Sequence, residues 1–124
     1  MNTDKMTEDV TERIIGCAIK VSNTLGVGFL EKVYENALVV ELARAGLLVE
    51  QQKPIQVSYE GVIVGELGAD IIVNGSVILE LKAAKIIDPV HQAQLLNYLK
   101  ATGLKVGLIL NFGTPRLGIK RMVL

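Results

Sequence analysis

The sequence has few of the residues that mark several common protein classes. It contains 3 Tyr, 2 Phe and 0 Trp in 124 residues, which argues against a surface that binds single-stranded nucleic acid by stacking successive bases. A single cysteine, Cys17, excludes an internal disulfide and a cysteine-rich zinc site. No apolar run approaches the ~18 residues of a membrane span, and the polar residues 1–5 lack the apolar stretch of a signal peptide. We therefore expect a cytoplasmic protein.

The remaining composition predicts one folded domain, residues 1–124. A chain of this length can bury a core without disulfides or metals, and 50% of its residues are hydrophobic. That fraction leaves room for a buried interface between subunits, so a homodimer is among the expected assemblies.

The formal net charge of zero hides an uneven distribution along the chain. Residues 1–81 carry 6 basic and 12 acidic side chains, whereas residues 82–124 carry 7 basic and 1 acidic. Such asymmetry is typical of a phosphate-contacting face beside an acidic metal site. The alternative is that the two halves neutralise each other on folding.

Acidic and basic residues interrupt two apolar stretches on either side of a turn signal. Residues 77–82 read as a strand, on which Glu80 and Lys82 share one face. Alone, this pattern is typical of an edge strand with a surface ion pair. Asp70 adds a second acid on the preceding strand. Two carboxylates on neighbouring strands offer oxygen ligands to Mg²⁺ or Mn²⁺, and a nearby lysine can hold or activate a water for phosphodiester hydrolysis.

This order of Asp70, a hairpin, Glu80 and Lys82 resembles the PD-(D/E)XK nuclease superfamily. Residues 28–34, Gly-Phe-Leu-Glu-Lys-Val-Tyr, match the G-x-x-E-x-x-Y motif of the GxxExxY protein family, a branch of that superfamily. The resemblance covers residues 11–123. It implies a restriction-endonuclease-like fold, a nuclease dependent on Mg²⁺ or Mn²⁺, and nucleic acid, DNA in particular, as the partner.

The resemblance also implies a set of catalytic residues. The metal ligands would be Asp70 and Glu80, with the backbone carbonyl of Leu81 as a third. Many nucleases of this superfamily present a helix-borne glutamate to the metal, which Glu31 matches. The catalytic set implied is Lys82, Glu80, Asp70, Glu31 and Gln94. The alternative for Glu31 is a structural role, in which its charge interacts favourably with the helix dipole in the first turn of its helix.

Further residues are expected to contact the nucleic acid. Gln94 and Tyr98 are four positions apart on one helix face and match a Q-x-x-x-Y element seen in some relatives; a solvated glutamine and a core-edge tyrosine would explain them equally well. The sole histidine is either a phosphate contact or a surface residue. The expected contacts are Lys85, Tyr98, His91 and Tyr34.

Periodicity and turn signals predict an α/β domain. Helical spacing covers residues 7–24 and 30–45, and alternation predicts an antiparallel meander over residues 55–82. Asp88 and Pro89 mark the start of a helix that runs to residue 101. The apolar run 105–110 then predicts a strand parallel to the earlier ones, because a strand–helix–strand unit crosses over. A short edge strand closes a mixed central sheet flanked by helices.

The turn at Asn74-Gly75 decides whether the acids meet. A two-residue turn would place Asp70 opposite Leu79, facing away from Glu80. A three-residue loop with a bulge shifts the register by one residue, so that Asp70 shares the face of Glu80. The catalytic interpretation therefore predicts an odd-length loop or a bulge, with Asp70 paired to Ile78.

Two other functions remain compatible with these residues, because fold does not fix function. One is a non-catalytic nucleic-acid-binding module on the same fold. The other is a protein-interaction module, which the apolar composition favours.

Overall fold

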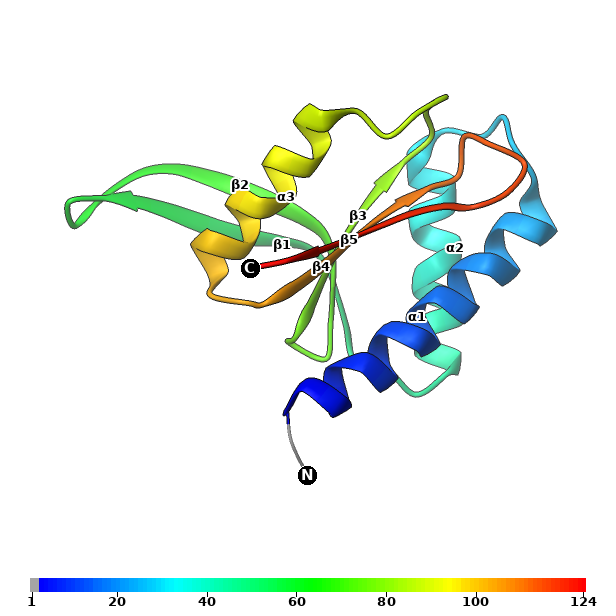
Figure 1. Ribbon diagram of the computed structural model, residues 1–124, viewed down its shortest axis with the longest axis horizontal. Coiled ribbons are helices and arrows are strands. Elements are labelled where there is room, and N and C mark those ends of the chain that lie inside the picture. The colour runs from blue at the N-terminus through cyan, green and yellow to red at the C-terminus, as the bar shows by residue number, and fades with distance from the viewer. Residues whose placement is uncertain (1–2) are drawn as a thin grey trace.

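The computed structural model describes residues 3–124, and within them five strands form one mixed sheet between helices (Figure 1). The elements in chain order are α1 (Thr3–Leu25), α2 (Glu31–Arg44), β1 (Val49–Tyr59), β2 (Val62–Val73), β3 (Val77–Lys82), α3 (Pro89–Thr102), β4 (Val106–Asn111) and β5 (Gly118–Val123). The strands lie side by side in the order β1-β2-β3-β4-β5. Only the β3–β4 pair is parallel, with α3 as its crossover, so the expected fold class is confirmed.

The sheet separates two apolar layers. Helices α1 and α2 cover one face, while α3 covers the other (Figure 1). Neighbouring residues in the central strands are buried on opposite faces: Leu79 packs with α1 and α2, whereas Ile78 packs against α3. Burial on both faces explains why these strands are apolar throughout rather than alternating.

Beyond the central sheet, β1 and β2 continue together as a two-stranded arm (Figure 1). The ladder between β2 and β3 contains only the pairs from Ile71↔Leu79 to Val73↔Val77. Past Ile71, β2 stays paired with β1 alone, out to the turn at residues 60–61. The point where β2 leaves β3 is therefore a fork in the sheet, and Asp70 stands at it.

The residues of the G-x-x-E-x-x-Y motif build the turn between α1 and α2. Gly28 has a φ of +110°, a conformation that favours glycine. The hydroxyl of Tyr34 donates to the carbonyl of Gly26 at 2.6 Å and accepts from the amide of Phe29 at 3.2 Å. Its ring is fully buried and stacks on Phe112 at 4.8 Å. The glycine and the tyrosine of the motif thus have structural roles.

None of the described helices is long and apolar enough to cross a membrane.

Candidate active site

The hairpin between β2 and β3 has the phase that brings the acids together. Asn74 and Gly75 adopt φ values of +52° and +60°, and the amide of Ser76 donates to the carbonyl of Val73 at 3.0 Å. Because Val73 pairs with Val77 rather than with Ser76, Ser76 is an extra residue in the connection. The expected odd-length loop is confirmed.

The partner expected for Asp70 was wrong by two positions. Ile78 lies opposite Ile72, not Asp70. Counting one step beyond the pair Ile71↔Leu79 places Asp70 opposite Glu80 itself. The expected and the observed partner differ by two residues, and side chains alternate along a strand, so Asp70 still shares a face with Glu80.

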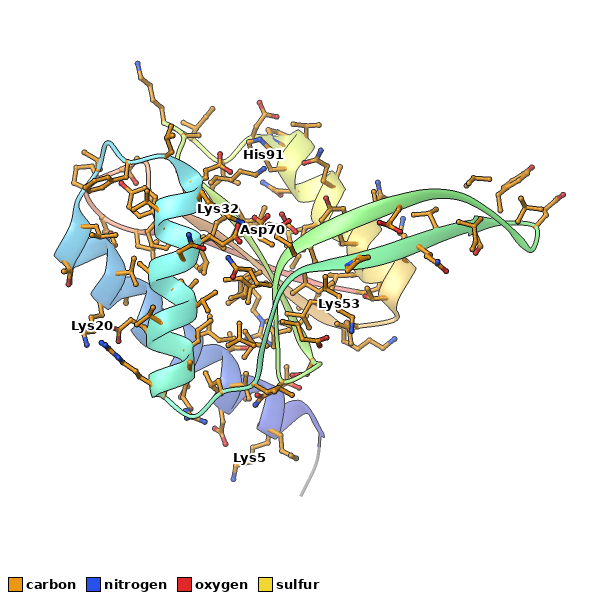
Figure 2. The ribbon with its side chains drawn as sticks, turned by 180° about the vertical axis from the view of Figure 1, so that it is seen from behind. Lys5, Lys20, Lys32, Lys53, Asp70 and His91 are labelled. Atoms are coloured by element: carbon orange, nitrogen blue, oxygen red, sulfur yellow. The ribbon has the colours of Figure 1, made fainter. Side chains whose placement is uncertain are left out.

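At the fork, carboxylates take the place of ladder hydrogen bonds. The amide of Leu81 donates to Oδ2 of Asp70 at 2.8 Å, and the amide of Asp70 donates to Oε1 of Glu80 at 3.3 Å. Figure 2 shows Asp70 at the base of the arm, between α2 and α3. Each carboxylate therefore binds the opposite strand, which holds the two acids face to face.

The environment of Glu80 favours its neutral form. Its side chain is buried, with 8% of the residue exposed. Burial, followed by the negative charge of Asp70, raises the pKa of Glu80 to about 9, while Lys82 opposes this only weakly. Without a cation, Glu80 therefore carries a proton at neutral pH.

Replacing Glu80 with glutamine should weaken the dependence of stability on pH. A carboxyl group whose pKa is raised on folding contributes stability that is complete below its unfolded pKa, near 4.5, and is lost as pH rises through about 9. In wild-type protein without divalent cations, the free energy of unfolding should fall across this window with a slope of up to ~1.4 kcal/mol per pH unit. Urea unfolding at pH 6, 7.5 and 9 measures this slope. Equal slopes for wild type and Glu80→Gln would contradict the assignment.

The helix-borne glutamate that reaches this region is Glu35, not Glu31. Glu31 is exposed in the first turn of α2, and no group of three or more acidic, His or Cys side chains forms a metal cluster within residues 3–124. The expectation that Glu31 joins Asp70 and Glu80 is therefore not met, and its dipole role remains. Glu35, one turn later, is buried with 4% exposed.

Three polar side chains hold Glu35 in its ionised form. Its Oε2 accepts from Lys32 at 2.9 Å and from Gln51 at 2.5 Å, and its Oε1 accepts from Gln52 at 3.0 Å. Burial would raise the pKa of Glu35, but these hydrogen bonds outweigh it and lower the pKa. One ammonium group and two side-chain amides thus hold this carboxylate in place, which suits a supporting role.

Gln52 links this buried carboxylate to the acid pair. Its Nε2 donates to Glu35 and also to Oδ1 of Asp70 at 3.3 Å. Gln52 has a φ of +54° and is skipped by the ladder, which pairs Gln51 with Ile71 and Lys53 with Ala69. A non-glycine residue in this conformation stores about 1–3 kcal/mol of strain. Here the strained backbone aims the amide at Asp70.

Comparison with protein-family models matches residues 8–122 to the PD-(D/E)XK nuclease superfamily. The chain belongs to this superfamily. The crystal structure of a protein named SSO0001 has the same fold: the TM-score is 0.58 at 17% identity, over 74% of this chain and 48% of that one. This chain thus spans about half of that protein. Comparison with curated protein sequences gives no significant match.

The acid pair suits the metal ion on which the PD-(D/E)XK superfamily typically depends. Asp70 and Glu80 supply hard oxygen donors at the fork, and a cation bound between them would relieve the repulsion that raises the pKa of Glu80. Mg²⁺ usually binds one or two carboxylates and keeps several waters. Asp70 and Glu80 are therefore enough as carboxylate ligands of Mg²⁺ without a third acid. The backbone carbonyl of Leu81 remains a predicted third ligand.

The other expected residues of this superfamily site have different surroundings. Lys82 follows Glu80 on the same face and is partly exposed. Tyr98 lies close enough that burial, then the charges of Glu80 and Asp70, raise the pKa of its hydroxyl. Gln94 is exposed one turn earlier and lines a groove together with Tyr98. The catalytic roles of these three side chains remain predictions.

Three residues expected at the nucleic acid have different surroundings. Lys85 is exposed and remains a predicted contact. His91 forms a capping box at the start of α3: its Nδ1 accepts from the amide of Asp88 at 3.3 Å (Figure 2). Tyr34 is fully buried, so the expectation that it contacts nucleic acid is wrong.

Asn111 is a buried polar residue that directly follows the predicted strand 105–110. It ends β4 opposite Lys82, and its side chain both accepts from the amide of Ala84 at 2.9 Å and donates to its carbonyl at 2.8 Å. These bonds fix the segment that follows Lys82. A polar residue directly after the buried run 106–110 was the available signal.

The basic residues of the second half form no ion pair within the described chain. Ion pairs of the described side chains join Lys20 to Glu41, Lys32 to Glu35, Arg44 to Glu41 and Lys53 to Glu50. All of them join residues of the first half. No ion pair between the two halves is therefore seen among the described side chains.

Proposed function

We propose that this protein is a metal-dependent nuclease that hydrolyses phosphodiester bonds of nucleic acid, with DNA as the expected substrate. Within its superfamily, residues 28–34 support membership of the GxxExxY branch. The observation that carries the proposal is the hairpin phase, which sets Asp70 against Glu80 and leaves Lys82 on the same face. A regular two-residue turn would have separated them.

Each residue of the proposed site has a defined task. Asp70 and Glu80 would hold Mg²⁺ or Mn²⁺, and the bound ion would polarise the scissile phosphate and offset the charge that develops on it. Because a cation must displace the proton on Glu80, binding is coupled to proton release. The ammonium group of Lys82 would hold the attacking water by a hydrogen bond. Gln52, supported by Glu35, keeps Asp70 oriented.

A cleavage screen tests the proposal. Purified protein is incubated with single-stranded, duplex and branched DNA and RNA in millimolar Mg²⁺ or Mn²⁺. Cleavage of at least one substrate, dependent on the cation and abolished by chelation, is the expected result. If no substrate is cut and calorimetry detects no divalent cation bound at millimolar concentration, the proposal fails.

Gln52→Gly should separate activity from stability. Glycine adopts the positive φ without strain, which offsets the lost hydrogen bonds, so the free energy of unfolding should change by about 1 kcal/mol or less. Loss of the bond to Asp70 should lower Mg²⁺ affinity or cleavage by about 10–100-fold. Glu60→Gly, which also replaces a residue of positive φ (+48°) but lies in the turn at the tip of the arm, is the control. Unchanged activity and metal affinity in Gln52→Gly would remove its positioning role.

One observation favours a protein-interaction module as the second candidate. The tip of the β1–β2 arm exposes several large apolar side chains, each more than half exposed: Tyr59, Val62, Ile63 and Val64. Exposed apolar strands commonly mark interaction sites. Light scattering reports whether two copies associate, and retained association of a protein that binds no metal would favour this candidate.

A further inference from the structure

A groove lies between the β1–β2 arm and α3. It has a volume of about 670 Å³, within the range of small-molecule sites. The arm contributes Gln56 and Leu67, and α3 contributes Asn97 and Tyr98. Leu67 lies three residues before Asp70 on β2, and the charges of Glu80 and Asp70 act on the hydroxyl of Tyr98, so the groove lies near the acid pair.

The groove is lined by apolar side chains, by side-chain amides and by one positive charge. Leu67 and Val57 are partly buried and supply apolar surface, and Tyr98 supplies an aromatic ring. Gln56 and Asn97 are exposed, and their side-chain amides make no hydrogen bond with other residues of the described chain. None of the residues that line the groove is acidic, and Lys100 adds one positive charge.

We infer that this groove receives one unpaired nucleobase of the strand whose phosphate lies at Asp70 and Glu80. The inference rests on the proposed nuclease function. A base has a flat apolar face and an edge with both donors and acceptors, which aromatic rings and side-chain amides complement. A sugar–phosphate backbone would call for more cations than Lys100 and would leave the apolar wall unused. The favoured substrates are therefore single strands, or duplexes with an unpaired nucleotide, rather than continuous duplex.

Binding measurements test the groove independently of cleavage. All proteins carry Lys82→Ala, so that Mg²⁺ can be present without cutting. The probes are a fluorescent single strand, its duplex, the duplex with one unpaired nucleotide, and that last probe with an abasic site at the unpaired position. The single strand and the unpaired-nucleotide duplex should bind about tenfold more tightly than the continuous duplex.

A double-mutant cycle then assigns the base to the groove. Asn97→Ala and Gln56→Ala should each weaken binding of the unpaired-nucleotide probe by about five- to tenfold, and have no further effect once the base is removed. Gln92→Ala, on the same helix but outside the groove, is the matched control and should change binding by less than twofold. Equal affinity for the continuous duplex, or an effect of Asn97→Ala that persists with the abasic probe, overturns the inference.

Failure of the inference and failure of the proposed function give different results. If Mg²⁺-dependent cleavage occurs in the protein with Lys82 but the cycle shows no coupling, only the base pocket is wrong. If the cycle shows coupling but no substrate is ever cut, the groove binds nucleotides and the nuclease proposal fails.

Discussion

Replacing Lys82 with alanine should lower the rate of metal-dependent cleavage by about 10²–10⁴-fold, because the attacking water loses the group that holds it. The change should act on the rate rather than on the site's assembly. The acid pair is held by backbone amides of Asp70 and Leu81, and these bonds do not involve the lysine side chain. Mg²⁺ affinity should therefore stay within a few-fold of wild type.

Lys20→Ala provides the matched control for this prediction. The Lys20 side chain is 63% exposed and its ammonium group pairs with Glu41 at 3.1 Å, and exposed pairs of this kind contribute little to stability. Single-turnover rates at saturating Mg²⁺, with calorimetry for Mg²⁺ affinity, measure both variants. A Lys82→Ala protein that cuts at the wild-type rate would mean that the water is held by another group.

Phe112→Ala should destabilise the protein by about 3–5 kcal/mol, a large part of the roughly 5–15 kcal/mol typical of a domain. Phe112 is 1% exposed and stacks on Tyr34, with the rings 12° from parallel. Few aromatic residues are available to fill the space, so a cavity should remain between the loop after β4 and the turn before α2. The melting temperature should fall on the order of 10–20 °C.

Phe29→Ala tests whether burial or aromatic contact produces that loss. Phe29 also touches Tyr34, edge to face at 6.1 Å, but it is 47% exposed. Its removal should cost about 1 kcal/mol or less. Thermal and urea unfolding compare the two variants. Similar losses in both would show that Tyr34 is not anchored by Phe112.

The sequence was sufficient to predict the fold because periodicity and turn residues mark its elements individually. Asp88 and Pro89 do start α3, and the apolar run ending at Leu110 is the buried strand parallel to β3. The face of the sheet on which Asp70 lies was also predictable, since Asp70 must share the face of Glu80 for the family's site to exist. The exact partner follows from the length of the loop, because a three-residue connection pairs Val73 with Val77 and therefore Asp70 with Glu80, not with the expected Ile78.

The side chains that hold Asp70 in place could not be predicted, because their hydrogen bonds join segments that are distant in the sequence. Glu31 and Glu35 are one helical turn apart and chemically identical. Only the approach of Gln51 and Gln52 from β1 distinguishes them. Nothing in a glutamine signals a positive φ, so the strained bulge at Gln52 has no local signature.

The extra residue in the β2–β3 hairpin also bears on how related sequences should be recognised. Asp70 and Glu80 are ten positions apart, and Val73 pairs with Val77 across a connection in which Ser76 is surplus. A chain that lacks this serine can keep the same pairing by closing Asn74-Gly75 as an ordinary two-residue turn. Its acids would face each other at a spacing of nine. A search pattern that fixes the spacing at ten would discard such a chain, whereas one that allows either length and asks which residues pair would retain it.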